Sequence, residues 1–347
     1  MDKIIIEDGL SLVQNRGVGQ YTQGIANMLQ ELGINYEMQR KNKLENIKNN
    51  IIRRILYLIW LNTFFLLKLL FTKNITKVIF TSTIVPIIKI KNIEYISVLH
   101  DILSTIHPEC RTKIQNVHAD FSTFCATHIA DKIITVSEFS KNEIKKHFKV
   151  NDDKIFIVNS SWSTNLEFDS IKNTLILNNF NTKPKHYILS VATIHKHKNL
   201  QLLIDAFEMY NQKNSDIKLI LVGANGNNKL LTNNQNIIFT GFISNEDLSF
   251  LYQNALIFVF PSLYEGFGTP CLDAQKYKIP LICSDIPVFK EVAGKGALFS
   301  KVTKEDFANT IEFAITNDMT PYIEEGQKNL NKYSMCSITK QLKKALY

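Results

Sequence analysis

Short runs of apolar residues recur along the chain and alternate with segments of helical periodicity. In the first half these runs fall at residues 4–7, 35–38, 78–81, 95–99, 132–136 and 154–158. The helical segments between them are predicted at residues 20–32, 45–70, 113–129 and 138–148. Strands without apolar–polar alternation are covered on both faces, and their alternation with helices predicts a parallel, doubly wound α/β sheet.

A polar stretch at residues 159–164 interrupts this rhythm, which then starts again. Further strands are predicted at 187–191, 218–222, 237–240, 256–260 and 280–283. Further helices are predicted at 199–212, 245–253, 269–278 and 321–346. A chain of 347 residues suits two domains of ordinary size. We therefore expect an N-terminal Rossmann-like domain at 1–165, a second at 166–320, and a C-terminal helical segment at 321–347.

The charge and the cysteines narrow the class of protein. The formal net charge of +8 favours anionic partners such as nucleotides or an acidic membrane surface. The sequence has no compact basic block with interleaved aromatics, which argues against nucleic acid. The five cysteines form no CxxC pair, so they predict neither a disulfide framework nor a zinc site. The opening strand argues against a signal peptide, and we expect a cytoplasmic protein.

The most hydrophobic segment, residues 51–71, needs a separate decision. Arg53, Arg54 and Lys68 interrupt it and argue against a membrane-spanning helix. Two alternatives remain open: a helix packed on the N-terminal sheet, or a helix lying in the membrane interface. In the second case the residues facing anionic lipid would be Lys41, Lys43, Lys48, Arg53 and Arg54.

A strand, a loop and a helix start meet between residues 255 and 273. Thr269 is a plausible N-cap, and Pro270 suits the first helical position. Ligands of open α/β sheets bind at the carboxyl ends of strands, and a helix N-terminus attracts phosphate. Glu265 and Asp273 flank this turn and suit the hydroxyls of a sugar nucleotide. A strand–helix corner without a ligand is the plain alternative.

Other polar side chains also follow predicted strands. Gly17 and Gly19 open a helix, but Thr22 stands where a dinucleotide fingerprint needs its third glycine. His100 follows one strand, and the basic loop ending at Lys198 follows another. A tight turn, a structural histidine and a solvated basic loop are the respective alternatives.

The spacing Glu265-x7-Asp273 resembles the Glu-x7-Glu signature of the family 4 retaining glycosyltransferases (group 1). Further motifs appear in that family's order from residue 17 to residue 294. They include Gly-x-Gly-x-Tyr-Thr from Gly17, His100-Asp101, Lys198-Asn199 and a Val-Ser-x-x-Ser turn at Ser137. The resemblance implies the GT-B fold, in which two Rossmann-like domains face a cleft. It also implies that the C-terminal helical segment packs back on the first domain.

The resemblance assigns roles to individual residues. Its catalytic set is Glu265, His100 and Lys198. Its donor-binding set is Gly17, Gly19, Thr193, Phe242, Ile243, Gly266, Phe267, Gly268, Thr269 and Asp273. Arg16 and Ser137 fall on the acceptor side, the latter at an exposed helix start. No Asp-x-Asp metal motif occurs in a suitable loop, and the resemblance implies metal-independent catalysis. Aspartate at 273 and histidine at 197 depart from the family pattern.

The implied reaction transfers a hexose or deoxyhexose from a nucleotide-diphosphate sugar with retained anomeric configuration. GDP-mannose is the first donor expected, followed by a dTDP- or GDP-linked deoxysugar. The acceptor expected is a glycan or a polyprenyl-diphosphate-linked sugar in bacterial O-antigen or capsule assembly, with peripheral contact to the anionic inner face of the cell membrane. The alternatives are a nucleotide-sugar epimerase of the same fold, and a non-catalytic membrane-associated protein that binds sugar nucleotides.

Overall fold

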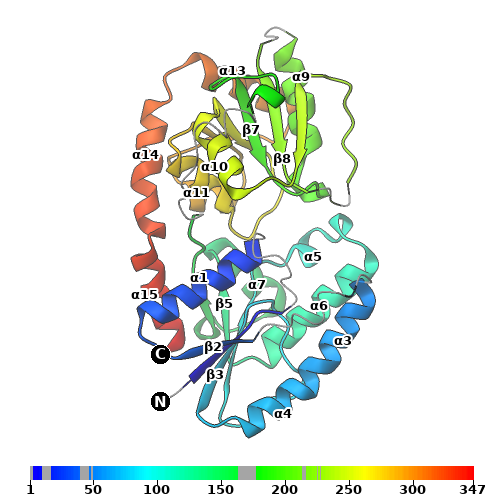
Figure 1. Cartoon of the computed structure of the whole chain (residues 1–347), viewed down its shortest axis with the longest axis vertical. Coiled ribbons are helices and arrows are strands. Elements are labelled where there is room, and N and C mark those ends of the chain that lie inside the picture. Colours follow the sequence, from blue (N-terminus) through cyan, green and yellow to red (C-terminus); the bar gives the residue numbers. More distant parts are fainter. Residues whose placement is uncertain are drawn as a thin grey trace. The chain divides into compact units, whose positions relative to one another are not determined.

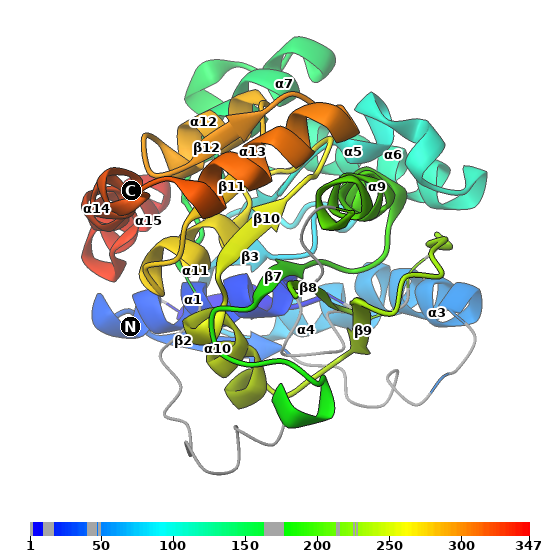
Figure 2. The same ribbon diagram turned by 90° about the horizontal axis from the view of Figure 1, so that it is seen from above.

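The computed structural model describes residues 3–9, 17–39, 47, 50–162, 177–212, 216–224, 226 and 228–347. The chain forms two compact units (Figures 1 and 2). Unit 1 comprises Met1–Ser161 and Tyr333–Tyr347, and unit 2 comprises Trp162–Lys332. Each unit holds one parallel sheet with helices packed against it, so the predicted doubly wound α/β architecture is confirmed.

Unit 1 is built on a six-stranded parallel sheet of order β2-β1-β3-β4-β5-β6. Its strands are β1 (Lys3–Glu7), β2 (Tyr36–Gln39), β3 (Ile75–Phe80), β4 (Glu94–Val98), β5 (Lys132–Thr135) and β6 (Ile155–Ile157). Each apolar run predicted in this half is a strand. The strand order reverses between β1 and β3, which is the switch point where ligands of such sheets bind.

Within the described residues, the α-helices of unit 1 are α1 (Gly17–Glu31), α3 (Asn50–Asn62), α4 (Phe64–Phe71), α5 (Leu103–Ile106), α6 (Lys113–His128), α7 (Glu138–Phe148) and α15 (Met335–Leu346). One helix was expected over 45–70, but α3 and α4 are separate. The Asn62 amide donates to the Leu58 carbonyl at 2.9 Å, and the Thr63 hydroxyl donates to the Ile59 carbonyl at 2.6 Å. Such side-chain bonds compete with the helical backbone, and the chain breaks at Thr63.

The two interpretations of residues 51–71 each describe one side of these helices. Tyr57, Leu61, Phe65 and Leu69 are buried in a cluster with residues of β1, β3 and β4. The opposite side exposes large apolar residues, among them Ile59 at 51%. The segment therefore packs on the sheet through one stripe and leaves the other uncovered.

Unit 2 is built on a second six-stranded parallel sheet, of order β12-β11-β10-β7-β8-β9. Its strands are β7 (Tyr187–Val191), β8 (Lys218–Val222), β9 (Ile237–Gly241), β10 (Ile257–Phe260), β11 (Leu281–Ser284) and β12 (Leu298–Ser300). Strand β12 was not predicted, because three residues carry too little periodicity. The order reverses between β7 and β10, so the switch point of unit 2 lies between these strands.

The α-helices of unit 2 that lie fully within the described residues include α9 (Leu200–Asn211), α10 (Asn245–Asn254), α11 (Thr269–Lys276), α12 (Pro287–Ala293), α13 (Lys304–Thr316) and α14 (Thr320–Leu330). Helix α13 packs against α9, with Phe207, Phe307 and Ile311 buried in one cluster.

The C-terminal segment was expected as one helical stretch over 321–346. A 3-10 turn at Asn331–Tyr333 divides it into α14 and α15. Helix α14 packs on α11 within unit 2, whereas α15 packs on α1 and β6 within unit 1. The Thr339 hydroxyl on α15 donates to Glu31 Oε2 on α1 at 2.8 Å. The chain therefore ends in the unit in which it begins.

Candidate functional site

Two loops meet at the switch point of unit 2, one after β7 and one after β10. The Leu263 amide donates to the His197 carbonyl at 2.8 Å and ties the loops together. Across the same junction Lys198 Nζ lies 2.5 Å from Glu265 Oε1. Two residues that the sequence placed in separate loops therefore form an ion pair where the strand order reverses.

The ion pair is largely shielded from water. The Lys198 and Glu265 side chains are 19% and 12% exposed, and Lys198 Nζ lies 5.6 Å from the centroid of the Phe260 ring. Charges in such a setting interact more strongly with a ligand than charges in bulk water. An ammonium group has three N–H donors, and Glu265 takes one of them. The pair is suited to hold an anionic group beside sugar hydroxyls.

The start of α11 is set by Gly268. Its backbone is left-handed, with φ 103° and ψ 52°, and it occupies the N-cap position. Thr269 is the first helical residue, so the predicted N-cap at Thr269 is wrong. A Cβ on Gly268 would lie 2.8 Å from Cε1 of Phe289, which makes glycine the residue that fits here.

Asp273 lies on α11 with only 6% of the residue exposed. Burial raises the pKa of the Tyr252 hydroxyl, and the nearby Asp273 carboxylate raises it further. Burial lowers the pKa of Lys276, and the same carboxylate partly opposes this shift. Asp273 thus has charged and polar neighbours inside unit 2, and its contact with a ribose stays a prediction.

The other residues predicted to bind the donor lie in the loops after β7, β9 and β10. Gly266 and Phe267 are buried between Glu265 and the start of α11, and Thr193 is half-buried after β7. Phe242 is 63% exposed and Ile243 is half-buried after β9. Strand β9 is the edge strand beyond β8, away from the switch point, so base contact by these two residues stays a prediction.

The loop after β7 is held in place by the loop after β8. A Cβ on Gly223 would lie 2.0 Å from the Ala192 carbonyl oxygen, and one on Gly226 would lie 2.0 Å from that of Ile194. The Ile194 amide also donates to the Ala224 carbonyl at 3.1 Å. These close backbone contacts hold the loop that leads to Lys198.

In unit 1, Gly17 and Gly19 form the first turn of α1, which begins three residues before the predicted helix start at 20. No atom lies within 4 Å of a Cβ placed on Gly17, so the space around it is open. Arg16 lies outside the described residues.

His100 follows β4 and is half-buried. Its Nε2 lies 3.2 Å from the Thr81 carbonyl oxygen, and its ring meets Tyr21 edge-on at 4.9 Å. Burial lowers the pKa of His100, so the ring is neutral at pH 7. A neutral ring suits an orienting role better than an electrostatic one.

Ser137 has a structural role in this unit. It is the N-cap of α7, where its hydroxyl accepts a hydrogen bond from the Ser140 amide at 3.0 Å. The residue is fully buried, so the exposed helix start expected from the sequence is wrong for this side chain. Its acceptor role stays a prediction.

Two further buried polar residues were not predicted from the sequence. Ser262 lies in the loop after β10, is fully buried, and its hydroxyl has no hydrogen-bond partner within the described ranges. In the sequence, only its position beyond the end of a strand indicated it.

Glu7 is the last residue of β1 and is fully buried. Its carboxylate accepts hydrogen bonds from the Tyr57 hydroxyl at 2.9 Å and the Gly9 amide at 3.1 Å. An acid ending the run Ile4–Ile6 was a usable signal.

No group of three or more His, Cys, Asp and Glu side chains that could hold a metal ion occurs in the part of the chain that the structure describes.

Comparison with known proteins finds relatives for about half of the chain. Residues 173–334 match the family model described as glycosyl transferases group 1. O-antigen chain mannosyltransferase B of Escherichia coli is 30% identical over 213 residues, which are 58% of this chain and 56% of that protein. The capsular polysaccharide biosynthesis glycosyltransferase CapM of Staphylococcus aureus is 28% identical over 240 residues, 63% of this chain and 61% of that protein. The matched region thus spans little more than half of either relative.

Solved structures match over the whole chain. Sucrose-phosphate synthase from Thermosynechococcus elongatus has a TM-score of 0.75 at 16% identity and covers 100% of this chain and 98% of its own. Anabaena Alr3699/HepE in complex with UDP and glucose has a TM-score of 0.72 at 15% identity, with coverage of 100% and 99%. These likenesses show the fold, which is GT-B. Over residues 173–334, the chain is similar to the group 1 glycosyltransferases.

Proposed function

We propose that the protein is a retaining glycosyltransferase that moves a hexose or deoxyhexose from a nucleotide-diphosphate sugar to an acceptor hydroxyl. The names of its relatives support a role in O-antigen or capsule assembly, and GDP-mannose is the first donor to test. The structural neighbour bound to UDP and glucose supports a sugar-nucleotide ligand.

The observation that carries this proposal is the Lys198–Glu265 pair at the β7/β10 switch point, with a 2.5 Å contact. A departing nucleoside diphosphate needs positive charge near its phosphates, and Lys198 supplies it. A sugar needs acceptors for its hydroxyls, and the Glu265 carboxylate supplies them. Both groups come from loops beside the strands where ligands of such sheets bind.

In the proposed reaction the bond between the anomeric carbon and the diphosphate oxygen breaks, and its electron pair leaves with the diphosphate. Lys198 and the amides at the start of α11 stabilise that charge. The acceptor oxygen bonds to the anomeric carbon, and its proton ends on the diphosphate. His100 would orient the transferred sugar. Because the positive charge comes from side chains, we propose that no metal is needed, and chelation with EDTA tests this.

We propose a glycan or a polyprenyl-diphosphate-linked sugar as the acceptor, at the cytoplasmic face of the cell membrane. The net charge of +8 supports attraction to such anionic substrates.

The test is nucleoside diphosphate release from a panel of GDP-, UDP- and dTDP-sugars with acceptor, with mass spectrometry of the product. Glu265→Gln and Lys198→Met should each lower kcat/KM by about 10²–10³-fold, since each removes a charge from the reacting centre. Glu246→Gln and Lys304→Met are matched controls, exposed in unit 2 and away from the switch point.

Near-normal transfer by Glu265→Gln would contradict the proposal. Conversion of the donor sugar without acceptor would identify an epimerase instead. Tight binding of a sugar nucleotide without turnover on any acceptor would identify a non-catalytic binding protein.

A further inference from the structure

Unit 1 exposes large apolar side chains on three helices and one loop. They form stripes at helical spacing on α3, α4 and α6. We call the set the apolar face: Ile52, Ile55, Leu56, Ile59, Phe64, Leu67, Leu70, Phe71, Ile87, Ile88, Ile114, Val117, Phe121 and Phe124. Their exposure runs from 39% for Leu56 to 84% for Phe71. Large exposed apolar patches mark docking sites.

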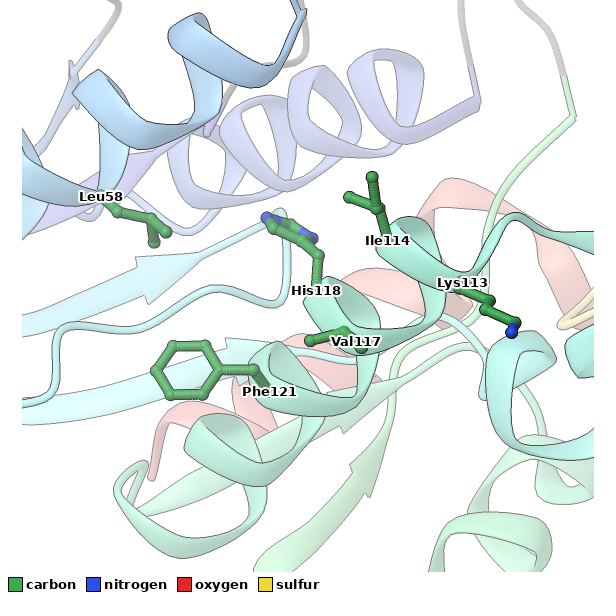
Figure 3. Close-up of a pocket in the computed structure, with 6 residues that line it drawn as sticks. All are labelled: Leu58, Lys113, Ile114, Val117, His118 and Phe121. Atoms are coloured by element: carbon green, nitrogen blue, oxygen red, sulfur yellow. The ribbon is translucent and has the colours of Figure 1, made fainter.

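A recess between α3 and α6 brings the stripes of these two helices together (Figure 3). Its volume is about 400 Å³, and its lining is Leu58, Lys113, Ile114, Val117, His118 and Phe121. Leu58 on α3 faces His118 and Phe121 on α6, and Lys113 lies at the far end of α6 (Figure 3). The Ile87 amide donates to Asn62 Oδ1 at 2.7 Å, which places the exposed loop against the end of α3.

Positive charge borders the same surface. Burial lowers the pKa of His118, and the guanidinium groups of Arg54 and Arg111 lower it further. Arg53 and Arg111 likewise lower the pKa of Arg54, after burial. In the described ranges no salt bridge joins Arg54, Arg111 or Lys113 to a carboxylate. Helices α3 and α4 contain no acidic residue.

The surface is suited to lie on a membrane and not to cross it. Residues Ile52–Phe71 are long and apolar enough to span a bilayer by length and composition. The helix is broken at Thr63, however, and Tyr57, Leu61, Phe65 and Leu69 are held in the core of unit 1. Insertion would pull these four side chains out of the core and expose its strands. The outward stripe can meet lipid without that cost.

We propose that the apolar face docks unit 1 on an anionic lipid bilayer, with α3, α4 and α6 at the interface and Arg54, Arg111 and Lys113 at the level of the lipid phosphates. Interfacial segments combine an apolar face with basic residues in this way. The charge is what selects a membrane over a second copy of the chain, because two copies would bring like charges together. The proposal does not depend on the proposed enzymatic activity.

The test is flotation of the full chain with vesicles of phosphatidylcholine alone, or of phosphatidylcholine mixed with phosphatidylglycerol. We expect binding to the anionic vesicles that weakens as salt is raised. The variant Ile59→Ser/Val117→Ser/Phe121→Ser removes exposed apolar side chains and should lose most of this binding. Its control, Leu231→Ser/Phe313→Ser, changes exposed apolar residues of unit 2 and should bind as the unchanged protein does.

The charge is tested separately. Arg111→Gln/Lys113→Gln should weaken binding by roughly fivefold for each charge removed, since each basic residue near anionic lipid contributes about 1 kcal/mol. Lys304→Gln/Lys344→Gln is the control, with two exposed lysines outside the apolar face. Circular dichroism and thermal unfolding establish that all variants fold.

Three results would overturn the proposal. The first is equal binding, or none, to both kinds of vesicle. The second is unchanged binding by both the apolar and the charge variants. The third is a dimer in multi-angle light scattering that the apolar variant converts to monomer, which would assign the face to a second copy. No donor or acceptor is present in these experiments, so their outcome is separate from the proposed transferase activity.

Discussion

At the scale of single residues, the sequence placed Lys198 and Glu265 in different loops, and the structure joins them at 2.5 Å. The position of each residue, directly beyond a buried strand, was predictable. Their pairing was not, because it depends on β7 and β10 being neighbours in the sheet. The N-cap of α11 was missed for a similar reason: the left-handed Gly268 is packed against Phe289, a residue of another helix.

Replacing Gly268 tests how the start of α11 is held. Gly268→Ala should destabilise unit 2 by about 1–3 kcal/mol, because the new Cβ meets Phe289 and the backbone is left-handed. The control is Gly24→Ala on α1, where a Cβ meets nothing within 4 Å. That change should stabilise unit 1 by roughly 0.5–1 kcal/mol. Urea unfolding measures both, and equal effects would show that Gly268 carries no special constraint.

The depressed pKa of His100 predicts a pH dependence of stability. Burial keeps the ring neutral in the folded state, whereas the unfolded ring takes up a proton near its ordinary pKa of about 6.5. The free energy of unfolding should therefore fall as the pH drops below about 6.5, by at most about 1.4 kcal/mol per pH unit for this one group.

The comparison for this prediction is His100→Gln, which cannot titrate. Urea unfolding from pH 7.5 to pH 5 should show a flatter profile for the variant than for the unchanged protein. Superimposable profiles would mean that His100 titrates alike in both states. His118, whose pKa is also lowered, remains in both proteins and cancels from the difference.

At the scale of elements, the strands of the sheet centres were predictable because buried parallel strands are continuous apolar runs. The break between α3 and α4 was not, since it arises from hydrogen bonds of Asn62 and Thr63 to the backbone one turn earlier. Helix α13 was overlooked although it has a start signal. The Thr303 hydroxyl caps it by accepting from the Asp306 amide at 3.1 Å.

Helix α3 is anchored to β1 by the hydrogen bond from Tyr57 to Glu7, both fully buried. Tyr57→Phe removes the hydroxyl and leaves the buried carboxylate with one donor fewer. Unit 1 should lose about 1–3 kcal/mol of stability in urea unfolding. Tyr347→Phe, at a residue that is 80% exposed, should change nothing. An unchanged stability of the Tyr57→Phe variant would mean that solvent replaces the missing donor.

At the scale of the whole molecule, two domains were predictable from length and from the restart of the strand–helix rhythm. The path of the chain between the two domains was less predictable, because the C-terminal segment was expected as one helical stretch. Tyr333 begins the part that returns to unit 1. Ser334, whose hydroxyl caps α15, is the local signal for a new helix there.

Removing α15 tests that return. Ile338, Leu342, Ala345 and Leu346 are at most 1% exposed, and their loss uncovers apolar surface on α1 and β6. Truncation after Ser334 should destabilise unit 1 by several kcal/mol. Limited proteolysis should then cut unit 1 faster, while sites in unit 2 stay protected. Equal protection of unit 1 with and without α15 would contradict its assignment to that unit.

The most direct test of the central claim treats Lys198 and Glu265 as one unit. The measurement is kcat/KM for sugar transfer by Lys198→Met, Glu265→Gln and the double variant. When two residues act together in catalysis, substituting either one removes most of their joint contribution to the rate. We predict that the double variant is nearly as active as the slower single variant, with both singles reduced by about 10²–10³-fold. Near-normal single variants, or losses that multiply in the double variant, would contradict a catalytic centre at the β7/β10 switch point.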